Sequence, residues 1–207
     1  MVYAYTPLNY PAEASITPDG ILSFLPSDDN KIYSISARVT DNYNVSDHKQ
    51  FQLSNGMIYT CGIQSGDDEQ IDYGETTFLN FILKNNSDLP LKDIVLSVGS
   101  EDPLVNWIDN EVTVGALEAG ESVDLEGSIS FGLNAIYPDG YNFTVDVLIS
   151  ASEGEWESRM NLTARAPALA VGTPTVDDGD NQRLDPGETA DIIIPVMNTG
   201  FAMAEEV

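Results

Sequence analysis

The sequence contains few of the residues on which enzyme catalysis usually depends. Among 207 residues there is one cysteine, Cys61, and one histidine, His48, so an intrachain disulfide is excluded. A Cys61–His48 nucleophile–base pair is conceivable, but no catalytic motif surrounds either residue. Nucleophile elbows, Gly-rich phosphate loops and Cys/His clusters with zinc spacing are also lacking. The sequence therefore predicts a protein that is not an enzyme.

Basic residues are scarce as well. Eight Lys and Arg residues stand against 34 Asp and Glu residues, which gives a formal net charge of −26. A surface this negative repels phosphate backbones and anionic lipids. We expect no nucleic-acid partner and no direct binding to a membrane surface, whereas cations, basic proteins and neutral glycans remain open as ligands.

Long apolar runs are absent. No stretch approaches the roughly 18 apolar residues that a membrane-spanning helix requires. The first residues have neither the basic nor the apolar region of a signal peptide. Hydrophobic residues still make up 42% of the chain, which predicts a folded protein. We expect a piece of a larger secreted or cell-surface protein whose targeting signal lies outside this sequence.

Period-two alternation of apolar and polar residues is the dominant pattern. It is clearest over 123–133 and 141–149, where one face of each strand is apolar. Further strands are predicted near 57–64, 77–85, 92–99, 105–115 and 156–165, and the segment 16–53 is predicted to form a strand, a turn and two strands. Seven short strands over about 110 residues are typical of an immunoglobulin-like β-sandwich, so the predicted fold class is all-β.

An internal repeat divides the chain. Residues 63–94 align without a gap to residues 176–207, so that Asp72 and Asp185 match at a constant offset of 113 positions. A repeat of this length indicates duplicated domains rather than a solenoid, whose units have about 20–50 residues.

The repeat and the alternation together predict the domain organisation. We expect a partial module at 1–54, a complete sandwich at 55–167 and the start of a second copy at 168–207. This last segment carries apolar side chains that must be buried against another element, namely those of Ile192, Ile194, Val196 and Phe201. We expect them to pair with the N-terminal module, with a sheet edge of the central domain, or with a second chain in a dimer.

The repeated segments contain acidic turns with the residue types that bind Ca²⁺. The second turn places oxygen-bearing side chains at loop positions 1, 5, 9 and 12, as an EF-hand does: Asp177, Asn181, Asp185 and Glu188. The first turn offers Asp68, Asp72 and Glu75. However, Gln182 stands where the EF-hand requires glycine. The alternative is an ordinary turn in which Asp185 caps the backbone, Gly187 supplies a positive φ and Glu188 opens the next strand.

Aromatic residues offer a second type of binding site. A glycan platform would use exposed aromatic rings, and the candidates are Trp107, Trp156, Tyr137, Tyr141 and Tyr73. Trp156 follows a turn and is expected to be the more exposed tryptophan. The alternative is that a sandwich of this size buries these rings in its core.

Two stretches resemble known families. Residues 16–53, with TPDGILSFLP at 17–26 and YSISARVTD at 33–41, resemble the second half of a cadherin-like putative Ig module. Residues 57–207 resemble immunoglobulin-like accessory modules of secreted Bacteroidetes proteins, including the region after the catalytic domain of gingipain-like cysteine peptidases. The shared pattern is DYGE at 72–75 with Asn85, and DPGE at 185–188 with Asn198; it also occurs in CARDB-like adhesion modules.

The resemblance implies a supporting role for this chain, and it assigns no catalytic residue. Accessory modules of this kind act as extracellular spacers or supports next to neighbouring modules of a larger secreted or surface protein, here with a peptidase as the implied parent. The alternative is an adhesion or carbohydrate-binding module with a glycan or protein ligand. The peptidase domain itself is not part of this sequence, so no catalytic residue is carried over.

Overall fold

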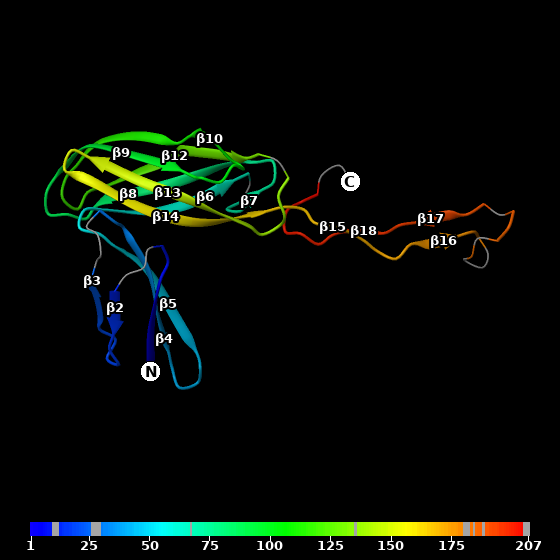
Figure 1. Ribbon diagram of the computed structural model, residues 1–207, viewed down its shortest axis with the longest axis horizontal. Coiled ribbons are helices and arrows are strands. Elements are labelled where there is room, and N and C mark those ends of the chain that lie inside the picture. The colour runs from blue at the N-terminus through cyan, green and yellow to red at the C-terminus, as the bar shows by residue number, and fades with distance from the viewer. Residues whose placement is uncertain are drawn as a thin grey trace.

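The computed structural model describes residues 1–9, 13–25, 30–66, 68–134, 136–179, 183, 185–187 and 189–204. All regular elements in these ranges are β-strands, so the all-β prediction is confirmed (Figure 1). None of the described ranges contains a helix long and apolar enough to cross a membrane.

The central part of the chain is a β-sandwich of two sheets. One sheet has four strands in the order β10-β12-β8-β6: β10 (Val105–Asp109), β12 (Ser122–Leu133), β8 (Thr76–Asn85) and β6 (Met57–Ser65). The other has five in the order β11-β9-β13-β14-β7: β11 (Glu111–Leu117), β9 (Leu91–Gly99), β13 (Tyr141–Ala151), β14 (Gly154–Arg165) and β7 (Ile71–Asp72). This division of strands between the sheets is that of an immunoglobulin-like sandwich.

The sandwich core follows directly from the period-two pattern. On β8, the side chains of Leu79, Phe81 and Leu83 are fully buried between the sheets, whereas Ile82 on the opposite face is 44% exposed. The facing sheet contributes the buried residues Ile94, Leu96, Val145, Val147 and Ile149. Burying each such side chain contributes about 2 kcal/mol to folding, which makes this core the main source of stability.

The prediction of a single strand at 105–115 is wrong. Two strands occur there: β10 pairs with β12 in one sheet, and β11 pairs with β9 in the other. Asn110 lies between them, and its side-chain and backbone hydrogen bonds to Val98 begin the pairing with β9. The chain therefore changes sheets at Asn110. The other predicted strands of the sandwich are confirmed to within about two residues at each end.

The N-terminal segment forms two small sheets beside one end of the sandwich (Figure 1). The larger has the order β1-β4-β5, with β1 (Val2–Pro7), β4 (Tyr33–Thr40) and β5 (Ser46–Leu53); β2 (Glu13–Ile16) pairs with β3 (Leu22–Leu25). The turn between β4 and β5 is fixed by Asp41, whose Oδ1 accepts the N–H groups of Tyr43 and Val45. The predicted strand, turn and two strands are confirmed.

The C-terminal segment is an extended hairpin that projects from the other end of the sandwich (Figure 1). In it, β15 (Leu169–Val171) pairs with β18 (Val196–Asn198), and β16 (Thr175–Asp177) pairs with β17 (Asp191–Ile193). Within the described residues this segment pairs with neither the N-terminal sheets nor a sheet edge of the sandwich. Two of its three expected partners are therefore wrong for this chain, and pairing with a second chain stays a prediction.

Candidate functional site

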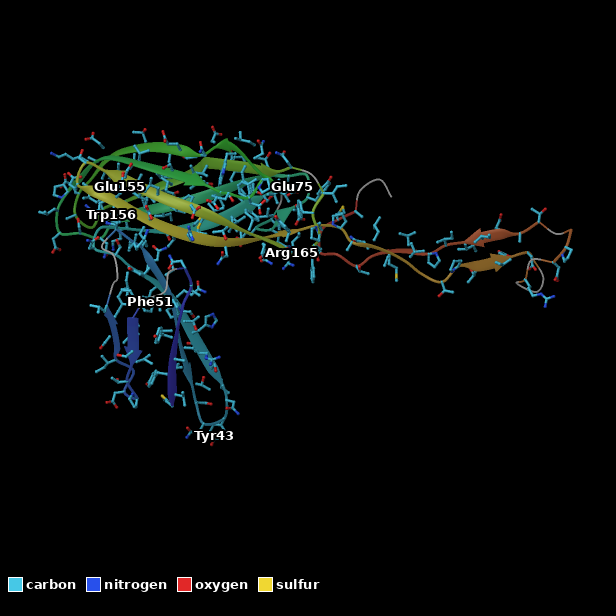
Figure 2. All side chains as sticks on the ribbon, viewed as in Figure 1. Tyr43, Phe51, Glu75, Glu155, Trp156 and Arg165 are labelled. Carbon is cyan, nitrogen blue, oxygen red and sulfur yellow. The ribbon has the colours of Figure 1, made fainter. Side chains whose placement is uncertain are left out.

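The first acidic turn lies at the end of the sandwich marked by Glu75 and Arg165 (Figure 2). Two of its three carboxylates, those of Asp68 and Glu75, accept local hydrogen bonds. Glu75 Oε2 accepts a hydrogen bond from Ser65 Oγ at 2.9 Å. Asp68 Oδ1 accepts the backbone N–H of Gln70 at 2.7 Å. These contacts are the ones that stabilise a turn.

Asp72 is the unusual member of this turn. Its Oδ1 is buried and accepts no hydrogen bond from the described residues. Burial raises the pKa of Asp72 above its ordinary value, the negative charges of Asp68 and Glu75 raise it further, and Arg165 opposes the shift. The ionised carboxylate of Asp72 is therefore a source of instability at neutral pH.

The described glycines of the second acidic turn have the backbone conformation of their counterparts in the first. Gly187 has φ of 95°, and its counterpart in the first turn, Gly74, has φ of 83°, so the positive φ predicted for Gly187 is confirmed. Asp177 accepts the backbone N–H of Gly179, and Asp185 forms an ion pair with Arg183 at 2.8 Å. Of the proposed calcium ligands, Asn181 and Glu188 lie outside the described residues.

The other five proposed ligands are all in the described ranges: Asp177 and Asp185 in the second turn, and Asp68, Asp72 and Glu75 in the first. In those ranges no three Asp, Glu, His or Cys side chains are grouped in a way that would hold a metal ion. Calcium binding by either turn stays a prediction.

The Cys61–His48 pair lacks the properties of a catalytic dyad. Burial raises the pKa of the Cys61 thiol to about 12, which keeps it protonated at neutral pH, whereas a nucleophilic cysteine needs a lowered pKa. His48 is exposed on β5, opposite Arg38 of β4.

Two of the five candidate glycan-binding aromatics are buried in the sandwich, two are half-buried and one is exposed. The expectation that Trp156 is the more exposed tryptophan is wrong: it is 6% exposed, and its Nε1 donates a hydrogen bond to Asn55 Oδ1. Its ring lies against Gly56 and belongs to the core cluster of the sandwich. Of the remaining candidates, Tyr137 is buried, Trp107 and Tyr141 are half-buried, and Tyr73 is 47% exposed.

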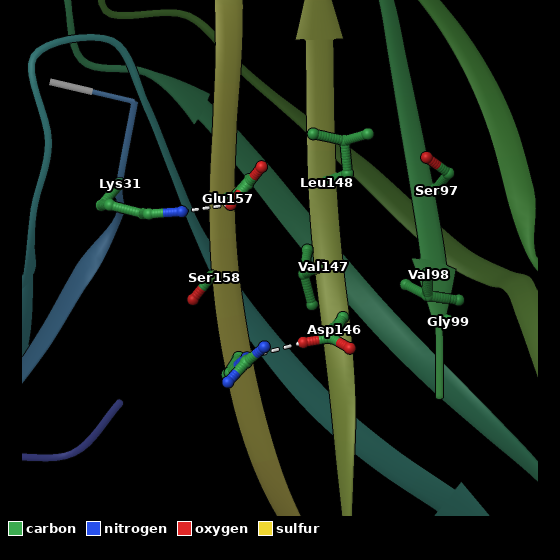
Figure 3. A pocket seen from close by; sticks show the side chains of 10 residues that line it. Lys31, Ser97, Val98, Gly99, Asp146, Val147, Leu148, Glu157 and Ser158 are labelled. Atoms are coloured by element: carbon green, nitrogen blue, oxygen red, sulfur yellow. Dashed lines mark hydrogen bonds and ion pairs between the residues drawn. The ribbon is translucent and has the colours of Figure 1, made fainter. Parts of the chain in front are cut away.

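A shallow depression lies on the outer face of the five-stranded sheet (Figure 3). It is lined by polar and aliphatic residues of β9, β13 and β14, Leu148 among them, and by Lys31 of the N-terminal segment. Two ion pairs occupy it, Lys31–Glu157 and Arg159–Asp146. No aromatic ring lines this depression, so it lacks the stacking surface on which glycan binding usually depends.

The junction between the N-terminal segment and the sandwich combines backbone pairing with a buried side chain. The backbone at Asn30–Ile32 pairs with β14: Ile32 N–H donates to Glu157 O, and Glu157 N–H donates to Asn30 O, both at 2.8 Å. The Ile32 side chain is fully buried in the core of the sandwich. The N-terminal segment therefore supplies both a single parallel β-bridge, Lys31 opposite Glu157, and a core residue to its neighbour.

Part-buried and buried polar contacts reinforce this junction. Asn9 Nδ2 donates to Ile32 O at 2.7 Å and to Ser158 Oγ at 3.2 Å, and Asn9 Oδ1 accepts the Ser34 N–H at 2.9 Å. Ser158 Oγ also accepts a hydrogen bond from Tyr59 Oη at 2.9 Å. Sequence reasoning missed these residues, because nothing in the sequence around Asn9 distinguishes it from an ordinary turn asparagine.

The junction with the C-terminal hairpin is smaller. Tyr137 Oη donates to Arg165 O at 3.2 Å, and the Arg165 guanidinium lies 4.8 Å from the centre of the Phe201 ring. Ala202 is buried at the base of the hairpin.

The strand order, the core and the junctions define the class of this protein as all-β, with immunoglobulin-like β-sandwich modules in tandem. No protein-family model and no curated protein matches the chain. Among solved structures it is similar to trypsin-activated alpha-2-macroglobulin from Escherichia coli, with a TM-score of 0.42 and 14% identity over 79% of this chain. The native conformation of the same protein gives a TM-score of 0.41 and 13% identity.

The chain spans only 11% and 10% of the length of those two chains. The class therefore rests on the strand order and packing of this chain itself.

Proposed function

We propose that the chain is a non-catalytic spacer of a larger extracytoplasmic protein, in which it holds neighbouring modules in a fixed relation. The observation that carries the proposal is the N-terminal junction, where Ile32 enters the sandwich core and Asn30–Ile32 extends a sheet of the sandwich. If the two units were joined by a flexible linker, the surfaces that they present to each other would instead be polar and solvated. The resemblance of residues 57–207 to accessory modules of secreted peptidases supports a peptidase as the parent protein.

The properties of the described residues favour a spacer over a binding module. Of the five aromatic side chains that could form a glycan platform, Trp156 and Tyr137 are buried, and two ion pairs lie in the outer-face depression. The net charge of −26 keeps such a segment soluble and prevents it from adhering to other acidic surfaces.

A distance measurement tests whether the junction is rigid. Spin labels at Lys49→Cys on β5 and Glu126→Cys on β12 report the position of the N-terminal sheet relative to the sandwich, because both residues are exposed on strands. Cys61 is replaced by serine to leave two labels. We expect a single narrow distance distribution in double electron–electron resonance.

Variants at the junction sharpen this test. Asn9→Ala combined with Ile32→Ala removes the buried hydrogen bonds and the core side chain, and we expect it to broaden the distribution. Ile21→Ala is the matched control, since Ile21 lies in the same segment but is 62% exposed. Two results would contradict the proposal. One is a broad distance distribution in the labelled chain without junction substitutions, and the other is a narrow distribution that the junction variant leaves unchanged.

A further inference from the structure

A groove lies where the N-terminal sheet approaches the outer face of the four-stranded sheet of the sandwich. Its volume is about 690 Å³, within the range of about 300–1,000 Å³ that is usual for ligand-binding clefts. Phe51 of β5 lines it, at the end of the N-terminal sheet that meets the sandwich (Figure 2). The sandwich contributes Ile58 of β6, Ile82 of β8 and Met160 of β14. The groove therefore has apolar walls formed by two separate units of the chain.

The apolar side chains of the groove are accessible to a ligand. Ile82 lies on the face of β8 that points away from the core and is 44% exposed. Phe51, Ile58 and Met160 are half-buried. The two walls are held in their relative position by the junction at Ile32, so the groove is present before any ligand binds.

The groove differs from the rest of the surface in its charge. Among the described residues no Asp or Glu lines it, although 34 of the 207 residues of the chain are acidic. The depression in Figure 3 contains Asp146 and Glu157 instead. Two cations line the groove: Arg159, which pairs with Asp146, and Lys84, which forms no ion pair with a described residue. Lys84 therefore gives the groove a positive charge with which no described carboxylate pairs.

The wall formed by β6 favours a polypeptide as the ligand. β6 is the edge strand of its sheet, and its Tyr59 N–H donates to the side-chain carbonyl of Gln52 on β5 at 2.8 Å. This edge therefore already binds an amide carbonyl from outside its own sheet. Extended peptides bind a sheet edge through the same contact between a backbone N–H and an amide carbonyl.

We propose that the groove binds an extended segment of a partner protein that has apolar side chains on either side of a carboxylate. The apolar side chains contact Phe51, Ile58 and Ile82, and the carboxylate pairs with Lys84. The net charge of −26 does not prevent this pairing, because exposed charges more than about 8 Å away are largely screened at physiological ionic strength. The inference uses the rigid junction of the spacer and goes beyond it, since it gives the chain a ligand.

The test titrates the full chain with a pool of acetylated and amidated peptides of the form Ser-X-Glu-X-Ser, in which X is valine, isoleucine, leucine or phenylalanine. Matched pools carry glutamine or lysine in place of glutamate. Binding is followed through the assigned amide signals of Thr60, Ile82 and Lys84 in NMR spectra of the ¹⁵N-labelled chain. We expect these signals to shift with the glutamate pool. The glutamine pool should bind about two- to fivefold more weakly, because an exposed ion pair contributes modestly, and the lysine pool should bind more weakly still.

Charge reversal at Lys84 tests the site itself. In Lys84→Glu the preference should reverse, so that the lysine pool binds more tightly than the glutamate pool. Lys92→Glu is the matched control, since Lys92 is exposed on β9 outside the groove and the variant has the same net charge. It should keep the preference for glutamate. Ile82→Ala removes apolar contact area and should weaken the binding of all three pools.

Several results would overturn the proposal. The absence of shifts with the glutamate pool would do so, as would an unchanged preference in Lys84→Glu. Shifts with maltohexaose but not with the peptides would make the groove a glycan site instead. Shifts that grow with protein concentration in the absence of peptide would make a second copy the occupant. A narrow distance distribution between the spin labels, combined with no peptide binding, would refute the groove alone and leave the spacer function standing.

Discussion

Asn85 is the polar side chain whose removal should cost most. It is fully buried at the end of β8, and its Nδ2 lies within hydrogen-bonding distance of the carbonyl oxygens of Leu89, Leu117 and Glu118 at 2.8, 3.1 and 3.2 Å. Its Oδ1 accepts hydrogen bonds from the N–H and Oγ of Ser87. Asn85→Ala deletes these bonds and removes the side-chain donor to the buried Leu117 carbonyl, whereas Leu89 O keeps the Ser87 Oγ donor and Glu118 O keeps the Glu121 N–H. At about 1 kcal/mol for each lost hydrogen bond and more for an unpaired buried group, the free energy of unfolding should fall by about 3–4 kcal/mol.

The repeat supplies a matched control for this variant. Asn198 forms the same turn, with hydrogen bonds to Ala202 O and from Gly200 N–H, but it is exposed. Water can replace its hydrogen bonds, so Asn198→Ala should change the free energy of unfolding by no more than about 0.5 kcal/mol. The two variants share the turn hydrogen bonds and differ in burial and in the additional bonds of Asn85 to Leu117 O and Glu118 O.

Denaturant unfolding followed by tryptophan fluorescence measures both variants. Both tryptophans lie in the sandwich, Trp107 on β10 and Trp156 on β14, so the signal reports on the unit that Asn85 stabilises. Equal losses for the two variants, or a loss below about 1 kcal/mol for Asn85→Ala, would refute the reasoning that burial sets the cost of losing these hydrogen bonds.

Four further measurements test other features. Gly56→Ala places a methyl group against the Trp156 ring and should destabilise the protein by about 2 kcal/mol in denaturant unfolding, whereas Gly99→Ala, with no atom within 4 Å of an added Cβ, should be nearly neutral. Because the pKa of Asp72 is raised, the native state binds more protons than the unfolded chain at pH values between the two pKa values, so stability falls as pH rises through that window. Asp72→Asn should therefore be more stable than the unsubstituted chain at pH 7 and should lose this advantage below the unfolded pKa of about 3.9. Thermal unfolding measured across pH would show this difference. Stability that changes with pH in parallel for both proteins would contradict it. Cys61, with its pKa near 12, should react with Ellman's reagent at pH 8 more than about 100-fold more slowly in the folded than in the unfolded chain, and equal rates would show that the thiol is not buried. The calcium hypothesis predicts that millimolar Ca²⁺ raises the Tm of the full chain and that EDTA reverses the rise, since a ligand that binds only the native state stabilises it; an unchanged Tm would leave Asp185 and Glu75 with turn roles alone.

The strands could be predicted from the sequence because burial on one face of a sheet imposes a period of two on the side chains. The positive φ of Gly187 could also be predicted, since it depends on local turn chemistry. The change of sheet at Asn110 could not, because it depends on a hydrogen bond to Val98, twelve residues away. The burial of Trp156 depends on a partner still more distant, Gly56.

The junction was beyond sequence reasoning for the same physical reason. Ile32 belongs to an alternating pattern that predicts a strand of its own sheet, yet its side chain completes the core of another unit. Alternation shows that a residue has an apolar environment, but it does not show which layer of the molecule provides it.

The N-terminal sheet is attached to the sandwich at two places separated along the chain. One is the covalent link from β5 into β6, and the other is the pairing of Asn30–Ile32 with Glu157. A single link would resist extension but would let the two units swivel about it. Two separated attachments also resist twisting, so a torque applied to the N-terminal sheet is transmitted to the sandwich. The arrangement therefore fixes the direction of the N-terminal sheet relative to the sandwich as well as its distance.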